Sequence, residues 1–293
     1  MVEKVGIVSL LIPIYNHEST VERALESVLC SDCSKIELIV CDDASTDQSY
    51  ERAAAWIDAH RDRFESVRSL RNPENLGITR NLNQMIGLAA GEFLTLFASD
   101  DELAENSVDL QRSHLQHNAA IDFVFANCGT IDPSGQTITG KVVSDRRARL
   151  VQRPTCSLVD IVFNWSLPWS RMFARRGALL KLGPYLEEHS FEDRWSTLMI
   201  ARTKRYGYLH EVVYLYRLRP HGSGTAGIDQ QRIFRDMRIV EEKMAGESLG
   251  SLRLLLQIHV RSASHNGRYR MKRLIWLAVR LLIATGHRLL VGR

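Results

Sequence analysis

The stretch IELIVCDDASTD, residues 36–47, decides how the first half of this chain folds. Its first six residues form an apolar run broken only by Glu37, a composition typical of a strand buried inside a parallel sheet. The run ends in Asp42 and Asp43, and residues 47–60 then follow with the pattern of a helix. A buried strand that passes through polar residues into a helix is the repeating unit of an α/β protein.

The same order of strand, polar residues and helix recurs before and after this stretch, as far as residue 127. Alternation of this kind predicts an α/β fold with a mostly parallel sheet and helices on both of its faces. The expected strands are residues 5–12, 36–41, 67–70, 93–98 and 121–127, and the expected helices are residues 19–29, 47–60, 79–90 and 103–117.

Three polar clusters lie directly after expected strands, at residues 13–16, 42–47 and 99–101. Parallel sheets bind ligands where the carboxyl ends of their strands meet. We therefore expect the three clusters to form one site at a single edge of the sheet.

The second half of the chain has a less regular pattern. Its expected segments are a hairpin turn at 132–140, irregular basic chain at 146–153, helices at 177–181 and 192–204, and paired strands at 207–218 around His210 and Glu211. A helical pattern is continuous from residue 229, so we place a domain boundary near residue 226. Residues 1–225 then form the α/β domain, and residues 226–293 form a basic helical extension.

Length and composition are those of an ordinary globular protein. The 293 residues suffice to bury a substantial core, with 45% hydrophobic and 25% charged residues. The first residues lack the pattern of a secretory signal, and no apolar run is long enough to span a bilayer. Cysteines are odd in number, and the lone pair Cys30 and Cys33 favours reduced thiols over a zinc site. We therefore expect a cytoplasmic protein.

Charge is distributed unevenly along the chain. No Asp or Glu follows Glu247, whereas nine Lys and Arg residues do, so a basic tail follows an acidic body. Arg273, Arg280 and His287 recur at seven-residue intervals and form one stripe on an otherwise aliphatic helix. Such a helix fits a membrane interface with anionic headgroups, so we expect residues 268–293 to hold the protein peripherally on the cytoplasmic face of a membrane.

The tail has alternative partners. The same helix is suited to packing against the rest of the chain or against a second copy in a homodimer. Its basic residues alternate with bulky aliphatic side chains rather than with aromatic rings that stack on bases, which argues against nucleic acid.

The cluster at residues 99–101 points to a metal ion. The adjacent carboxylates of Asp100 and Asp101 repel each other unless a cation lies between them. Mg²⁺ and Mn²⁺ prefer one or two carboxylates together with phosphate oxygens and water. An ion held here would stabilise a diphosphate as a leaving group. The alternative is a helix N-terminus before Leu103, where acidic side chains are also favourable.

The cluster at residues 42–47 fits recognition of a nucleotide base. An acidic side chain at this strand end can accept a hydrogen bond from the imide or amino edge of a base. Ser45 or Thr46 can also cap the next helix, with Asp47 in its first turn. Capping does not account for the two aspartates that come directly before it.

Six motifs within residues 5–225 resemble, in order and spacing, those of family 2 glycosyltransferases. Each motif is weak alone, but their order is highly specific. They are residues 9–16 with Glu18 and residues 27–29; residues 42–47, similar to DDxSTD; residues 75–77 with Arg80 and Asn81, similar to NxGxxxARN but with Thr79 in place of Ala; residues 99–101, similar to the metal-binding DxD region; Glu192 and Asp193; and Tyr216 and Arg217 with His221 and Ser223, similar to YRxHxxS.

This resemblance implies a GT-A fold for residues 1–225, a Rossmann-like sheet that binds a nucleotide-diphosphate sugar. By position, Pro13, Tyr15 and Asp43 would hold the base, and Arg80 would lie near the base or the diphosphate. A UDP-sugar is the usual donor in the family, with dTDP- and GDP-linked sugars as alternatives.

The resemblance also implies a metal-dependent, inverting transfer of the sugar to a hydroxyl group. Asp101 with Asp100 would hold Mn²⁺ or Mg²⁺ and the donor's phosphate and ribose, and His221 would be a late metal or phosphate contact. Asp193 would take the proton of the acceptor, because a sugar hydroxyl is a poor nucleophile. Without the family pattern, Glu192 and Asp193 are better explained as acids in the first turn of a helix, and His221 is equally well explained as a loop histidine.

The acceptor is expected to be a saccharide or a lipid-linked saccharide. Aromatic faces pack well against sugar rings, although core packing is the better explanation of any single tryptophan. The candidate acceptor contacts are Trp165, Trp169, Glu192 and Trp195. No QxxRW motif of processive synthases follows Asp193, so we expect one sugar to be added per encounter.

The sequence argues against two other classes of enzyme. A sugar nucleotidyltransferase would need a glycine- and lysine-rich phosphate loop after the first strand, and an oxidoreductase would need GxGxxG, whereas residues 13–18 read PIYNHE. A non-catalytic binding module remains a third alternative, and it would not show metal-dependent binding of a nucleoside diphosphate.

Overall fold

The computed structural model describes residues 4–163, 168, 171–187, 192–218, 230–247 and 250–263. The strands within these residues are β1 (Lys4–Ile14), β2 (Ile36–Asp42), β3 (Ser66–Arg71), β4 (Gly91–Leu96), β5 (Glu102–Leu103), β6 (Phe123–Ile131), β7 (Thr137–Thr139), β8 (Met172–Arg175) and β9 (Tyr206–Arg217). The helices are α1 (Val21–Val28), α2 (Ser49–His60), α3 (Ile78–Leu88), α4 (Ser107–His117), α5 (Asp145–Val151), α6 (Pro154–Phe163), α7 (Arg176–Leu182), α8 (Glu192–Thr203), α9 (Gln230–Glu247) and α10 (Gly250–Ala263).

These strands form one sheet in the order β3-β2-β1-β4-β8-β6-β9-β5, with β7 paired to β6. β3, β2, β1 and β4 are mutually parallel, and β6 is parallel to β9. β8 lies antiparallel between β4 and β6, so β4 and β6 point in the same direction. The predicted α/β fold with a mostly parallel sheet is confirmed.

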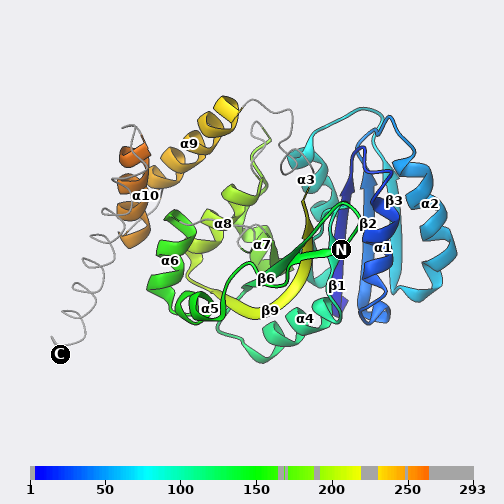
Figure 1. Cartoon of the computed structure of the whole chain (residues 1–293), viewed down its shortest axis with the longest axis horizontal. Coiled ribbons are helices and arrows are strands. Elements are labelled where there is room, and N and C mark those ends of the chain that lie inside the picture. The colour runs from blue at the N-terminus through cyan, green and yellow to red at the C-terminus, as the bar shows by residue number, and fades with distance from the viewer. Residues whose placement is uncertain are drawn as a thin grey trace.

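Helices cover both faces of this sheet (Figure 1). Because side chains alternate along a strand, Leu10 and Ile12 of β1 join a core with α1, α2 and α4, whereas Leu11 joins a core with α3, α7 and α8. β2 is buried along its whole length, as its apolar run predicts. Glu37 is tolerated there because its carboxylate accepts a hydrogen bond of 2.6 Å from the hydroxyl of Ser9.

The C-terminal helices pack on the α/β domain. α9 contacts α8 and α10 contacts α6, and Val240, Met244 and Leu255 belong to the same hydrophobic core as α8. The helical pattern predicted after residue 229 is confirmed in α9 and α10. The boundary near residue 226 and the basic tail at 268–293 lie outside the described residues and stay predictions.

Four segments of the second half differ from the sequence prediction, among them α6, which was not predicted. Residues 207–217 belong to one strand, β9, and not to a hairpin. His210 and Glu211 form a bulge between Leu209, which pairs with Ala126, and Val212, which pairs with Asn127, and pairing with β6 continues on either side. The segment predicted as irregular is α5, capped by the hydroxyl of Ser144. β8 was not predicted, since four residues are too few to show an alternating pattern.

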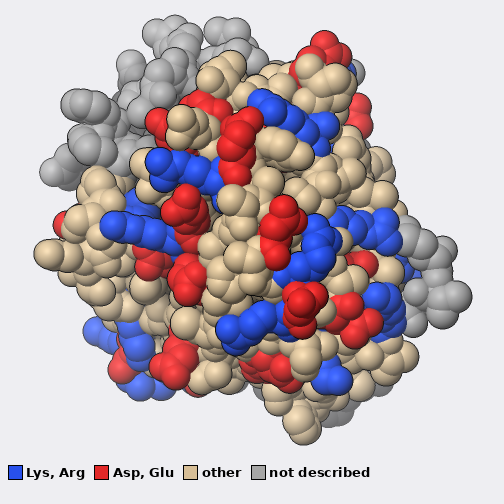
Figure 2. All heavy atoms as spheres, turned by 90° about the vertical axis from the view of Figure 1, so that its right-hand side faces the viewer, with Lys and Arg blue, Asp and Glu red and all other residues tan. Residues whose placement is uncertain are grey.

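No described helix is long and apolar enough to cross a membrane. On the face formed by α2 and its neighbours, at the right of Figure 1, basic and acidic side chains are interspersed (Figure 2). Exposed ion pairs join the elements there, among them Arg52–Glu22 at 3.6 Å and Arg71–Glu51 at 3.2 Å. Pairs this exposed contribute about 1 kcal/mol or less each, so the buried cores dominate the stability of this layer.

Candidate active site

The three polar clusters lie together at one edge of the sheet, as predicted. β1 lies between β2 and β4, so the loop after β1 is flanked by the loops after both neighbours. The Ser99 hydroxyl donates to the carbonyl of Pro13 (2.9 Å), and the backbone N–H of Asn16 donates to the Ser45 hydroxyl (2.9 Å). Hydrogen bonds therefore connect the central loop to both of the others.

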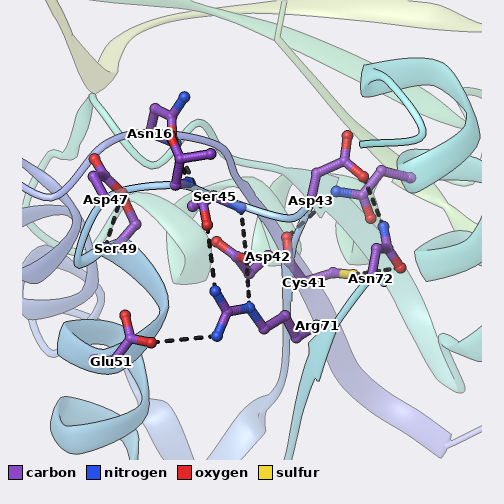
Figure 3. A network of polar contacts seen from close by, with 12 residues as sticks. Asn16, Cys41, Asp42, Asp43, Ser45, Asp47, Ser49, Glu51, Arg71 and Asn72 are labelled. Carbon is purple, nitrogen blue, oxygen red and sulfur yellow. Dashed lines mark hydrogen bonds and ion pairs between the residues drawn. The ribbon is translucent and has the colours of Figure 1, made fainter. Parts of the chain in front are cut away.

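Asp42, the last residue of β2, holds its loop to β3 (Figure 3). Its buried Oδ2 accepts the backbone N–H of Ser45 at 3.0 Å and lies 3.5 Å from Nε of Arg71. Arg71 also pairs with Glu51 of α2. Oδ2 of the first aspartate is therefore used within the protein, and the side chain is fully buried.

Asp43 points the other way and organises the loop before α3 (Figure 3). Its Oδ1 accepts hydrogen bonds from Nδ2 of Asn72 (2.8 Å) and the backbone N–H of Leu76 (2.9 Å), and its Oδ2 accepts the N–H of Gly77 (2.9 Å). Gly77 has a φ of +81°, a conformation that favours glycine. A carboxylate has about four lone-pair sites, so about one is left for a base.

Asp43→Asn is expected to lower the free energy of unfolding by about 1–3 kcal/mol, because an amide nitrogen cannot accept the N–H groups now paired with Asp43. Urea denaturation of the two proteins measures this difference. Asp58→Asn is the matched control, since Asp58 is exposed on α2 and should change stability by no more than about 0.5 kcal/mol. Equal effects of the two substitutions would contradict the anchoring role.

Asp101 is buried, with both carboxylate oxygens in use. Oδ1 accepts the backbone N–H of Arg217 at the end of β9 (3.0 Å), and Oδ2 accepts from Nη2 of Arg171 (3.2 Å). Burial raises the pKa of Asp101 to about 6, although the positive charge of Arg171 opposes that shift. The guanidinium of Arg217 donates to the carbonyl of Asp100 and pairs with Glu102, which holds the turn around Asp101.

The start of α8 lines a cavity at this edge of the sheet. Glu192 and Asp193 line it together with Pro13, Phe97 and Arg171. Asp193 is the predicted base, and Arg171 is the partner of Asp101. The two therefore line one cavity together with residues at the ends of β1 and β4. The structure brings these groups together from segments far apart in the chain.

Burial and like charge change how this pair of acids titrates. The pKa of Glu192 is raised to about 8, first by burial and then by the charge on Asp193. Burial also raises the pKa of Asp193, and Arg171 opposes that rise. Near neutral pH the pair therefore keeps a proton on Glu192, which leaves Asp193 as the group able to accept another.

Glu192→Gln is expected to raise the melting temperature near pH 8.5 and to leave it nearly unchanged near pH 5. Glu192 has a pKa of about 8 in the folded chain and about 4.5 in the unfolded chain. Between these two pH values the folded chain binds a proton that the unfolded chain does not, so the wild-type protein loses stability as the pH rises from about 4.5 to about 8. Glutamine has no such proton to lose. Calorimetry without added metal should show a gain of roughly 10 °C; a gain of the same size near pH 5 would contradict this cause.

Arg194 holds the start of α8 in place, and no sequence motif identified it. It is buried, and its Nη2 pairs with Glu241 of α9 at 2.6 Å. It also donates to the carbonyls of Ile161 (2.6 Å) and Val162 (3.2 Å) at the end of α6. Its position directly after Asp193 lets this network orient the predicted base.

The other predicted site residues have different surroundings. Arg80 is half-exposed on α3 and pairs with Glu187 at 3.3 Å rather than lining the cavity. Tyr15 is 44% exposed on the loop after β1, where a ring is accessible for stacking on a base. Outside the described residues lie the predicted contacts Trp165, Trp169 and His221.

Trp195 lies in a second cavity. This cavity has a volume of about 220 Å³, against about 100 Å³ for the carboxylate-lined one, and lies between α3, α7 and α8. Its lining is almost entirely apolar, and Tyr185 and Ser196 border both cavities. The smaller cavity is the candidate active site, because it alone of the two is lined by carboxylates, those of Glu192 and Asp193, whereas Asp43, Asp100 and Asp101 do not line it.

The residues around Asp101 fit a divalent metal ion whose ligands come partly from the protein and partly from the phosphates of a substrate. Among the described residues no three His, Cys, Asp or Glu side chains gather as a metal site. Mg²⁺ and Mn²⁺ are commonly held by one or two carboxylates, water and substrate phosphates, so a complete protein cage is not required. Oδ2 of Asp101 already faces a cation, the guanidinium of Arg171.

Residues 9–161 match the model of a protein family described as "Glycosyl transferase family 2". The chain belongs to glycosyl transferase family 2. The matched stretch contains Asp43, Arg80, Asp100 and Asp101, whereas Glu192 and Asp193 lie beyond it. The family assignment made from the six motifs is confirmed.

Relatives of this family 2 chain occur among bacterial glycosyltransferases. It is 29% identical over 141 residues to UDP-Glc:alpha-D-GlcNAc-diphosphoundecaprenol beta-1,3-glucosyltransferase WfgD of Escherichia coli, a match covering 48% of this chain and 52% of that protein. The chain spans about half the length of the curated relatives it matches.

Solved structures share the fold of this family 2 chain. Staphylococcus aureus TarS 1-349 in complex with UDP-GlcNAc has a TM-score of 0.65 at 19% identity, covering 87% of this chain and 70% of that chain. The mannosyltransferase PcManGT from Pyrobaculum calidifontis, in complex with GDP-Man and Mn²⁺, has a TM-score of 0.58 at 17% identity, covering 96% and 81%. The predicted GT-A fold class is confirmed.

Proposed function

We propose that this family 2 protein transfers a sugar from a nucleotide-diphosphate donor, a UDP-sugar by default, to a hydroxyl group of a saccharide or lipid-linked acceptor. The supporting observation is the cavity at the carboxyl edge of the sheet that Asp193 lines together with Arg171, whose guanidinium pairs with Asp101 behind the cavity lining. WfgD is named for a UDP-glucose donor and a diphosphoundecaprenol-linked acceptor, and TarS was solved with UDP-GlcNAc.

Asp193 is the proposed base. Its carboxylate lines the cavity at the N-terminus of α8, and its Oδ1 accepts the backbone N–H of Arg194 at 2.6 Å, which fixes its direction. In this role it accepts the proton of the acceptor hydroxyl as the new glycosidic bond forms and the bond to the diphosphate breaks. A single displacement of this kind inverts the anomeric carbon.

Mn²⁺ or Mg²⁺ is the proposed cofactor. Asp101 would hold it, with Asp100 beside it and His221 as a further contact, and the metal would supply positive charge to the departing diphosphate. PcManGT was solved with Mn²⁺. On the base side, Asp43 has about one acceptor site left, and Pro13, Tyr15 and Arg80 complete the proposed donor contacts.

The transfer is proposed to add one sugar per encounter at the cytoplasmic face of a membrane, with residues 268–293 providing the attachment. Incubating the full chain with a panel of nucleotide sugars and Mn²⁺, and measuring released nucleoside diphosphate, tests the activity. We expect release from one donor, stimulated by acceptor and abolished by EDTA. Absence of release from every UDP-, GDP- and dTDP-sugar with lipid-linked and free saccharides would contradict the proposal.

A further inference from the structure

Arg171 lies where the proposed metal would bind, and no motif gives it a role. It directly precedes β8, whose antiparallel direction brings its first residue to the carboxyl edge of β4. Nη2 of Arg171 lies 3.2 Å from Oδ2 of Asp101, and the guanidinium lies over the ring of Tyr214 at 6.0 Å. The same side chain lines the cavity that contains Asp193.

The contact between Arg171 and Asp101 is weak for a charged pair. At 3.2 Å the hydrogen bond is longer than the roughly 2.7–2.9 Å of strong charge-assisted bonds. Nε of Arg171 is buried and has no hydrogen-bond partner among the residues that the structure describes, so this nitrogen does not form a second, parallel bond to Asp101. With 23% of its side chain exposed, Arg171 is open to the cavity.

The contact between Arg171 and Asp101 affects how a metal ion would bind, because the metal ion and the guanidinium are both positively charged. A divalent cation and a guanidinium compete for Oδ2 of Asp101, because each repels the other at this distance. If metal arrived alone, it would displace Arg171 from Asp101, its closest charged partner, and leave only the carboxylates of Asp100 and Asp193 nearby. A diphosphate arriving with the metal would supply a new partner, since a planar guanidinium matches the geometry of phosphate oxygens.

We propose that Arg171 is an internal counter-ion of Asp101 that a metal–donor complex displaces, and that the released guanidinium then binds the diphosphate of the donor. This inference rests on the proposed function. Its consequence is that metal and nucleoside diphosphate bind together: each raises the affinity for the other by the same factor. Arg171 would thus prevent Asp101 from taking up metal before the donor arrives.

Binding of Mn²⁺ to the full chain tests this role without an activity assay. Electron paramagnetic resonance of free Mn²⁺ gives the Mn²⁺ affinity, alone and with saturating UDP. In the wild-type protein we expect UDP to tighten Mn²⁺ binding at least about tenfold. Arg171→Met should bind Mn²⁺ alone about tenfold more tightly than wild type, the effect of about 1.4 kcal/mol, and should lose most of the coupling to UDP.

Control variants separate this role from general damage. Arg176→Met removes an arginine from the other end of β8, outside the cavity, and should behave as wild type. Arg171→Lys should keep the competition because it keeps the charge. If Arg171→Met does not fold, Arg171→Gln carries the same prediction.

Two results would overturn the inference in distinguishable ways. Unchanged or weaker binding of Mn²⁺ alone by Arg171→Met, with UDP coupling intact, would refute the counter-ion role and leave the proposed function standing. Failure of the wild-type protein to bind UDP with Mn²⁺ would refute both.

Discussion

Asp193→Asn is expected to lower kcat by about 10³-fold while the affinity for UDP with Mn²⁺ changes by less than about twofold. General-base catalysis by a positioned side chain contributes about 10²–10⁴-fold, and asparagine removes the proton acceptor without changing the shape of the cavity. The network of Arg194 that orients this position remains, because it uses the arginine side chain and Glu241. Steady-state kinetics and calorimetric titration of the same preparation measure the two quantities.

The matched control for this substitution is Asp58→Asn, which changes an exposed carboxylate on α2 far from the cavity. It should keep both kcat and UDP affinity. If Asp193→Asn kept more than about a tenth of the wild-type kcat, another group would have to accept the proton, and Glu192 would be the first candidate.

Asp101→Asn is expected to weaken UDP binding in the presence of Mn²⁺ by about 10²-fold or more. The amide is a poorer ligand for a hard cation than the carboxylate, and its N–H₂ group would face Arg171 or the N–H of Arg217, both donors. Loss of the pair should also cost about 1–3 kcal/mol of stability, because Arg171 keeps its charge without this partner.

The double substitution Asp101→Asn with Arg171→Met separates binding from stability. Removing both charges should restore part of the lost stability, measured by urea denaturation, without restoring Mn²⁺-dependent UDP binding. Recovery of binding in the double variant would show that Asp101 is needed only to hold Arg171 and not to hold metal.

Much of the parallel sheet and its functional edge was predictable from sequence, because the signals are local. β1, β2 and β4 are apolar runs, and their polar clusters follow within a few residues, so the carboxyl-edge rule places them together. The strand directions of the second half gave no such signal. β8 has only four residues, and its pairing with β4 and β6 depends on contacts distant in the chain.

The residues missed by sequence reasoning depend on these distant contacts. Arg171 reaches Asp101 only because β8 runs antiparallel at this edge. Arg194 is oriented by Glu241 in α9, a helix that the sequence assigned to a separate extension. A single arginine carries no local pattern, so neither role could be derived before the fold was known.

The aspartates that follow β2 show the same limit on a smaller scale. Sequence places Asp42 and Asp43 side by side, and either could be the residue that recognises a base. The end of the strand separates them: Asp42 turns toward Arg71, and Asp43 turns toward Asn72 and Gly77 (Figure 3). The role of Asp43 in binding a base stays a prediction, since three donors already occupy most of its about four acceptor sites.

Calorimetric titration of UDP into the full wild-type chain, with Mn²⁺ and again with EDTA, tests most directly whether this cavity binds a nucleoside diphosphate through a cation. We expect a dissociation constant below about 1 mM with Mn²⁺ and binding at least tenfold weaker with EDTA. Equal affinity under both conditions, or no heat with UDP, GDP or dTDP, would contradict the account.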